Sequence, residues 1–134
     1  MLNRLFVDTS FVIALINEKD QYHHQAKLLS YEFENSQLMT TGAVLLEIGN
    51  ALAKDFREEA VKVIRVLRNS KRVEVAEIDE TLSGKGLAVY EKYADKTWGL
   101  VDCISFVVMW EGGLIKVLTF DEDFEQAGFS FANG

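Results

Sequence analysis

Apolar residues follow two different spacings along this chain, and together they predict an alternation of strands and helices. Short apolar runs bounded by polar residues, such as RLFV at 4–7, are typical of buried strands, whereas apolar positions every three to four residues indicate helices facing a core. Strands are predicted at 4–7, 37–41, 73–78, 114–119 and near 129–132. Helices are predicted over 11–16, 22–34, 43–55, 57–69, 80–94 and 100–111, with a helical turn at 122–127.

This order of elements predicts an α/β protein with a mostly parallel sheet and helices on both faces. Neither an internal repeat nor a linker divides residues 1–134, so we expect a single domain. In open parallel sheets, functional groups gather beyond the carboxyl ends of the strands. Asp8 follows the first predicted strand and Asp121 follows the strand at 114–119, so we expect these two carboxylates to share a site.

Four carboxylates lie at the edges of apolar segments, where an ionised group is costly unless something compensates its charge. They are Asp8 in RLFVDTSF, Glu47 in AVLLEIGNAL, Asp102 in GLVDCISFVVMW and Asp121 in VLTFDEDF. Lysine and arginine are scarce beside them in the sequence. A divalent cation would compensate all four at once, because Mg²⁺ and Mn²⁺ prefer oxygen ligands. The sequence therefore predicts a shared metal site, with Asp123 as a weaker candidate from the same turn as Asp121.

Each acid also has a simpler structural interpretation, which the sequence leaves open. Asp8 could cap the helix that follows it, and Asp102 could be stabilised by the dipole of the helix at 100–111. Glu47 could pair with a distant lysine inside the fold, and the acids from Asp121 onward could form a solvated turn. A shared metal site would explain all four acids at once, whereas the structural interpretations require a separate explanation for each.

Composition narrows the remaining classes of function. The chain has 134 residues, 49% of them hydrophobic, and its net charge of −7 argues against unselective binding of polyanions. The single cysteine, Cys103, lies in an apolar helical run and is expected to be a small buried hydrophobe, which fits a reducing, cytoplasmic location. No apolar run approaches the length of a membrane span and no signal peptide is evident, so we expect no membrane association.

The acid set favours hydrolysis of a phosphodiester over other chemistries, because hard divalent ions neutralise the phosphate, activate water and steady the leaving oxygen. The only histidines, His23 and His24, are adjacent in a helical stretch and would not share a face, so a zinc site is not expected. The sequence contains neither a GxxxxGK[ST] phosphate-binding loop nor a GxSxG nucleophile motif.

Residues 54–72 carry seven of the fourteen basic side chains against three acids, so charge is unevenly distributed. Within this stretch Arg65, Arg68 and Arg72 are predicted to fall on one helix stripe and to contact a nucleic-acid backbone without reading its sequence. A solvated helix face opposite the apolar residues is the simpler interpretation of the same stripe.

Taken in order, these motifs resemble those of the PIN-domain ribonucleases. FVDTSFVIALIN, LLEIGNAL, LVDCISFVVM and LTFDEDF are similar in order and spacing to that family, and more narrowly to the VapC toxins of bacterial and archaeal toxin–antitoxin pairs. The resemblance covers essentially the whole chain. It implies a three-layer α/β/α sandwich and a Mg²⁺- or Mn²⁺-dependent endoribonuclease that arrests translation. It also implies a frequent homodimer and a cognate antitoxin that occludes the site.

By position, the resemblance assigns the catalytic and metal-binding roles to Asp8, Glu47, Asp102 and Asp121. It implies that Thr9 and Thr119 are the hydroxyl residues that support these acids. Two positions depart from the family pattern: Val101 stands where Ser or Thr is common, and Asp123 where another residue, often His, is found. Such departures alter hydrogen bonding around the ligands and the preference for a metal. They remove none of the four carboxylates, so we expect activity to survive.

Two alternative functions remain open at this point. A receiver-like signalling domain would also bind Mg²⁺ beyond a parallel sheet, but it would want adjacent acids after the first strand, where Asp8 is followed by Thr9. A catalytically silent PIN-like module would serve as an interaction scaffold, although the intact set of acids argues against it.

Overall fold

All strands of the computed structural model, which describes residues 4–132, join one parallel sheet. They are β1 (Arg4–Val7), β2 (Gln37–Thr41), β3 (Val73–Ala76), β4 (Lys116–Leu118) and β5 (Ser130–Phe131), in the order β3-β2-β1-β4-β5. Phe6 of the central strand β1 pairs with Met39 on one side and with Val117 on the other. Every pairing is parallel, so the chain must cross over between strands, and it does so through helices.

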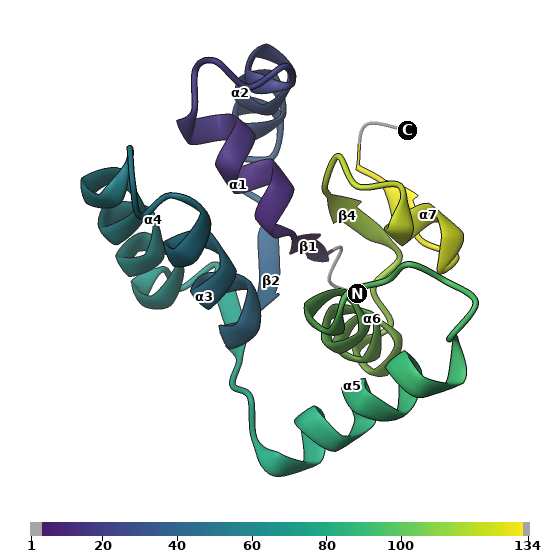
Figure 1. Ribbon diagram of the computed structural model, residues 1–134. Coiled ribbons are helices and arrows are strands. Elements are labelled where there is room, and N and C mark those ends of the chain that lie inside the picture. The colour runs from purple at the N-terminus through teal and green to yellow at the C-terminus, as the bar shows by residue number, and fades with distance from the viewer. Residues whose placement is uncertain (1–3, 133–134) are drawn as a thin grey trace.

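The helices cover both faces of this sheet. They are α1 (Thr9–Ile16), α2 (His23–Glu32), α3 (Gly42–Ala51), α4 (Arg57–Asn69), α5 (Glu80–Lys92), α6 (Leu100–Gly112) and α7 (Asp123–Gln126). Figure 1 shows α1 to α4 on one side of the strands and α5 and α6 on the other. Right-handed crossovers require this division, because the chain steps from β1 to β3 in one direction and from β3 to β5 in the other. The predicted α/β/α sandwich is confirmed.

The core joins the central strand to α6. Residues 103–109 of α6 are all buried, as is expected of a helix that is apolar on every side. The ring of Phe106 meets Phe124 edge to face at 5.0 Å, and both side chains are fully buried with Phe6. Cys103 is 0% exposed, as predicted for a small hydrophobe. Between residues 4 and 132, no helix has both the length and the apolar character needed to cross a membrane.

Several predicted elements are longer than the observed ones. The helix predicted over 43–55 ends at Ala51, because Leu52 turns into the core and begins the connection to α4. The strand predicted to reach residue 78 ends at Ala76, which pairs with Thr41, the last residue of β2. Within residues 4–132, no neighbouring strand continues beyond that pair.

The two C-terminal strands are also shorter than predicted. Leu114 belongs to the turn that closes α6, because its N–H bonds to the carbonyl of Met109 after the left-handed Gly113 (φ 68°). The strand predicted over 114–119 is therefore confined to β4, and the one near 129–132 to β5.

Candidate active site

The candidate site lies where the direction of the sheet reverses. β1 and β4 are neighbours, yet the chain leaves β1 toward β2 and leaves β4 toward β5, on opposite sides. Such a switch point leaves a crevice at the carboxyl ends of the two strands. Asp8 follows β1 directly, whereas Thr119 and Asp121 follow β4. The first turn of α6 brings Asp102 to the same crevice.

Asp8 is held by two hydroxyl groups. It is 3% exposed, and its Oδ2 accepts hydrogen bonds from Thr119 Oγ1 at 2.7 Å and from Ser10 Oγ at 3.0 Å. Each hydroxyl oxygen in turn accepts a backbone N–H: Phe120 N donates to Ser10 at 2.9 Å, and Asp121 N donates to Thr119 at 3.0 Å. Each hydroxyl can thus accept from the backbone and still donate its proton to Asp8, and the two hydroxyl oxygens lie 3.0 Å apart in the same network. Asp8 also caps α1, so the capping interpretation and a functional role coexist.

The ionisation of Asp8 is set mainly by its burial. Burial raises the pKa of Asp8 to about 6, and the negative charge of Asp121 contributes in the same direction. The hydrogen bonds from Thr119 and Ser10 act against this shift, because they stabilise the charged carboxylate. With a pKa of about 6, Asp8 is mostly ionised at neutral pH, and the hydroxyl pair stabilises this charged form.

Three further carboxylates converge beside Asp8. One carboxylate oxygen from each of Asp102, Asp121 and Asp123 lies within 4.8 Å of the other two. Asp102 Oδ2 accepts the N–H of Gly99 at 3.3 Å, and Asp121 Oδ1 accepts the N–H of Asp123 at 2.9 Å, so local backbone fixes both side chains. All three are half-buried.

These acids repel one another. The pKa of Asp102 rises to about 8, through burial first and then through the charges of Asp8 and Asp121. Burial and the charge of Asp121 also raise the pKa of Asp123. The group is made of hard oxygen donors with an excess of negative charge, and a divalent cation fits such a set because it removes the repulsion that raises these pKa values.

Glu47 lies at the edge of this group. Its Oε1 accepts a hydrogen bond of 2.6 Å from Thr9 Oγ1, so α3 is tied to the residue beside Asp8. Glu47 is half-buried and makes no ion pair within the described residues, which removes the interpretation of a buried Glu–Lys pair. It is not part of the group of three converging carboxylates.

The structure thus brings most of the predicted acids together, but the members of the converging group differ from those that the sequence favoured. Asp123, a weak candidate in the sequence, belongs to the converging group, whereas Glu47 reaches the site through Thr9. Ser10 was not among the residues predicted for the site, but its hydroxyl contacts Asp8 directly. The sequence spacing could have indicated this contact, because a hydroxyl two residues after an aspartate that ends a strand can fold back onto its carboxylate. The catalytic roles of these residues stay predictions.

The predicted basic stripe is less regular than its spacing suggested. Arg72 lies beyond α4, which ends at Asn69, so its assignment to a helix stripe is wrong. Arg72 instead donates to the carbonyl of Ser36 at 2.6 Å, and Arg68 pairs with Glu77 at 3.1 Å. Arg65 is exposed on α4. RNA contact by these arginines stays a prediction, with Arg68 and Arg72 already engaged inside the protein.

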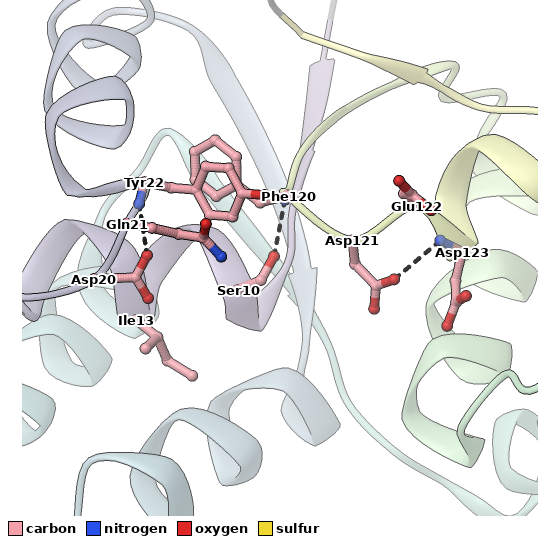
Figure 2. Close-up of a pocket in the computed structure, with 9 residues that line it drawn as sticks. All are labelled: Ser10, Ile13, Asp20, Gln21, Tyr22, Phe120, Asp121, Glu122 and Asp123. Atoms are coloured by element: carbon pink, nitrogen blue, oxygen red, sulfur yellow. Dashed lines mark hydrogen bonds between the residues drawn. The ribbon is translucent and has the colours of Figure 1, made fainter.

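A pocket of about 520 Å³ opens next to the acids. Figure 2 shows the residues that line it: Ser10, Ile13, Asp20, Gln21, Tyr22, Phe120, Asp121, Glu122 and Asp123. The rings of Tyr22 and Phe120 are stacked with their centroids 4.6 Å apart and an interplanar angle of 4°. The pocket therefore has an aromatic wall on one side and the metal-binding candidates on the other.

Fold, site and sequence together assign this chain to the PIN domain family, whose model matches residues 5–130. The curated 23S rRNA-specific endonuclease VapC20 of Mycobacterium tuberculosis is 32% identical to it over 125 residues, which are 93% of this chain and 95% of that protein. The crystal structure of M. tuberculosis VapC20, described as a sarcin–ricin loop cleaving toxin, matches with a TM-score of 0.84 and 30% identity, covering 94% of this chain and 96% of that one.

More distant structures share the fold alone. VapBC2 from Rickettsia felis, bound to a DNA fragment from its promoter, matches with a TM-score of 0.64 at 12% identity, and covers 93% of each chain. FitAcB from Neisseria gonorrhoeae matches with a TM-score of 0.62 at 17% identity, and covers 95% of each chain. Membership of the PIN domain family removes the receiver-like alternative.

Proposed function

We propose that this protein is a divalent-metal-dependent endoribonuclease and the toxin of a toxin–antitoxin pair. The observation that carries the proposal is the convergence of Asp102, Asp121 and Asp123 beside the buried Asp8, at the switch point of the sheet. The relation to a 23S rRNA-specific endonuclease over most of the chain supports the choice of RNA as substrate.

Asp8, Asp102, Asp121 and Asp123 would hold Mg²⁺ or Mn²⁺, with Glu47 at the edge of the site. When bound, such an ion neutralises the scissile phosphate and makes a water molecule a stronger nucleophile. The chain's own residues prepare the site. Thr119 and Ser10 fix the direction of the Asp8 carboxylate, and Thr9 fixes Glu47. Asp102 holds a proton at neutral pH in the metal-free state, because its pKa is about 8, so metal binding should release protons.

The proposed substrate is a structured loop of ribosomal RNA, by analogy with the sarcin–ricin loop named for the M. tuberculosis relative. Cleavage there would arrest translation, and the proposed location is therefore the cytoplasm. The proposed partner is a cognate antitoxin that covers the site until it is degraded. Purification of the protein with the product of the adjacent reading frame, and loss of nuclease activity in that complex, would support the pairing; full activity in the complex would contradict it.

The nuclease itself is tested with purified protein and an RNA hairpin carrying the sarcin–ricin loop, beside a pool of hairpins with randomised loops. We expect cleavage with Mn²⁺ or Mg²⁺, none with EDTA, and none by Asp8→Asn. Glu32→Gln is the matched control, because Glu32 is an exposed acid of α2 outside the site. Equal cleavage by wild type and Asp8→Asn would point to a contaminant. Absence of both cleavage and Mn²⁺ binding would favour the catalytically silent module.

We also propose that two copies associate. Leu46 on α3 and Val66 on α4 are 68% and 63% exposed, and exposed apolar side chains on these two helices gain from being covered. Light scattering should then give twice the mass of the chain, and Leu46→Glu should give the mass of one copy. A single-chain mass for the wild type across the micromolar range would refute the association.

A further inference from the structure

The pocket beside the acids offers surfaces that the hydrolytic reaction does not use. Ile13, Tyr22 and Phe120 form its apolar and aromatic part, and none of them belongs to the converging carboxylates. Its volume of about 520 Å³ lies in the range of pockets that hold small ligands. Tyr22 and Phe120 are half-buried, so part of this aromatic surface remains accessible.

The position of the pocket restricts what could fill it. Asp121 and Asp123 belong both to its lining and to the converging carboxylates, so the pocket begins where the scissile phosphate would lie. Gln21, Ser10 and Asp121, all drawn in Figure 2, line the same cavity, which therefore extends from the aromatic wall to the acids. A group that enters it must therefore be covalently close to that phosphate.

The charge of the pocket restricts its ligand further. Its lining contains four acids, Asp20, Asp121, Glu122 and Asp123, and no lysine or arginine. A second phosphate would be repelled there, whereas an uncharged aromatic ring would not. Unstacked bases of RNA loops are commonly bound by aromatic side chains and by polar groups that contact the base edges.

The geometry points to a nucleobase subsite: the base of a nucleotide that flanks the cleaved bond packs against the aromatic wall formed by Tyr22 and Phe120. This inference rests on the proposed ribonuclease function and names the part of the substrate that the same site selects. Asp20 Oδ1 already accepts the N–H of Tyr22 at 2.8 Å, so its side chain is fixed at the rim. A carboxylate only accepts hydrogen bonds. Uracil also carries a donor, its N3–H, but two carbonyl oxygens flank it and a carboxylate repels them. The subsite therefore favours a base with an exocyclic amino group over uracil.

The first experiment maps the selection. The pool of hairpins with randomised loops is cleaved with Mn²⁺, and the loop sequence around each cut is determined. We expect wild type to disfavour uracil at one position flanking the cut, Tyr22→Ala to lose this preference, and Asp20→Asn to shift it toward uracil, because the amide adds donors. Tyr31→Ala is the matched control, since Tyr31 is an aromatic residue of α2 that is 65% exposed and outside the pocket.

The second experiment separates base recognition from a structural role of Tyr22. One cleaved hairpin is prepared with an abasic nucleotide at the selected position. We expect the abasic change to lower kcat/KM of wild type by roughly tenfold or more, as for loss of one base–aromatic contact. The same change should leave kcat/KM of Tyr22→Ala nearly unaltered. Tyr22→Phe keeps the ring and should behave as wild type. A purely structural defect would lower the rates on intact and abasic RNA by the same factor.

Each outcome decides a different point. Cleavage without any base preference at a flanking position, or a preference that Tyr22→Ala retains, would overturn the subsite and leave the nuclease standing. Equal rate losses on intact and abasic hairpins in Tyr22→Ala would also overturn it. Absence of metal-dependent cleavage of every hairpin in the pool would reject the proposed function, and the subsite with it.

Discussion

Replacement of Asp8 by asparagine should stabilise the metal-free protein at alkaline pH. The pKa of Asp8 is raised from 3.8 to about 6, chiefly by burial. A difference of one pKa unit corresponds to 1.36 kcal/mol, so the charged Asp8 costs the native state about 3 kcal/mol. Asparagine has nearly the same shape and carries no charge, and its side-chain oxygen can still accept the hydrogen bonds from Thr119 and Ser10.

The sign of the pH dependence follows from proton binding. Between pH 3.8 and about 6 the native state binds a proton at Asp8 that the unfolded chain has released. The stability of wild type therefore falls as pH rises through this window, and the full penalty is present above it. Asp8→Asn lacks this titration. The advantage of the variant should grow by about 2 kcal/mol between pH 4.5 and pH 8. Relief of the repulsion on Asp102 acts in the same direction.

Urea unfolding of both proteins in EDTA, at several pH values between 4.5 and 8, measures this difference. Glu32→Gln, an exposed acid on α2, should track wild type at every pH. Mn²⁺ at pH 8 should stabilise wild type far more than the variant. The ion stabilises a protein by binding its folded state, and the variant lacks one of the proposed carboxylate ligands. A stability difference between wild type and Asp8→Asn that stays constant with pH would refute the assignment of a buried, raised-pKa carboxyl to this position.

Three further predictions test other parts of the structure. Thr119→Val removes a donor to Asp8 and the acceptor of a backbone N–H, and should lower the free energy of unfolding by about 1–3 kcal/mol; an unchanged urea midpoint would contradict the hydroxyl network. Gly86→Ala places a Cβ 2.5 Å from Cγ1 of Ile104 and should lower Tm through a cost of about 1–3 kcal/mol. Gly84 is in the same helix, and a Cβ added there would meet no atom within 4 Å, so Gly84→Ala should instead raise Tm by removing a flexible residue. Equal changes in Tm for the two variants would argue against close packing of α5 on α6. Calorimetry of Mn²⁺ binding at pH 7.5 should give an apparent enthalpy that changes with the ionisation enthalpy of the buffer, since binding displaces protons from the acids. Identical enthalpies in MOPS and Tris would show that none is released.

Much of the fold and part of the site could be predicted from local sequence. The apolar runs and helical spacings indicated each strand and helix to within a few residues, because burial of one face imposes its period on the sequence. The acid at the end of β1 stood out for a similar reason, since Asp8 directly follows three core residues. Strand ends were less predictable: β3 stops where β2 stops pairing with it, and that depends on a neighbouring strand.

The sequence by itself determined the order of elements and the candidate acids, because both are properties of short segments. Only the tertiary structure decided which acids meet: Asp123 joins Asp102 and Asp121, and Glu47 reaches the site through Thr9. It alone placed the ring of Tyr22 on Phe120, 98 positions away in the chain, to form the wall of the pocket. The physical reason is that distances between side chains depend on how helices and strands pack, and no local period encodes the contact between two residues so far apart in sequence.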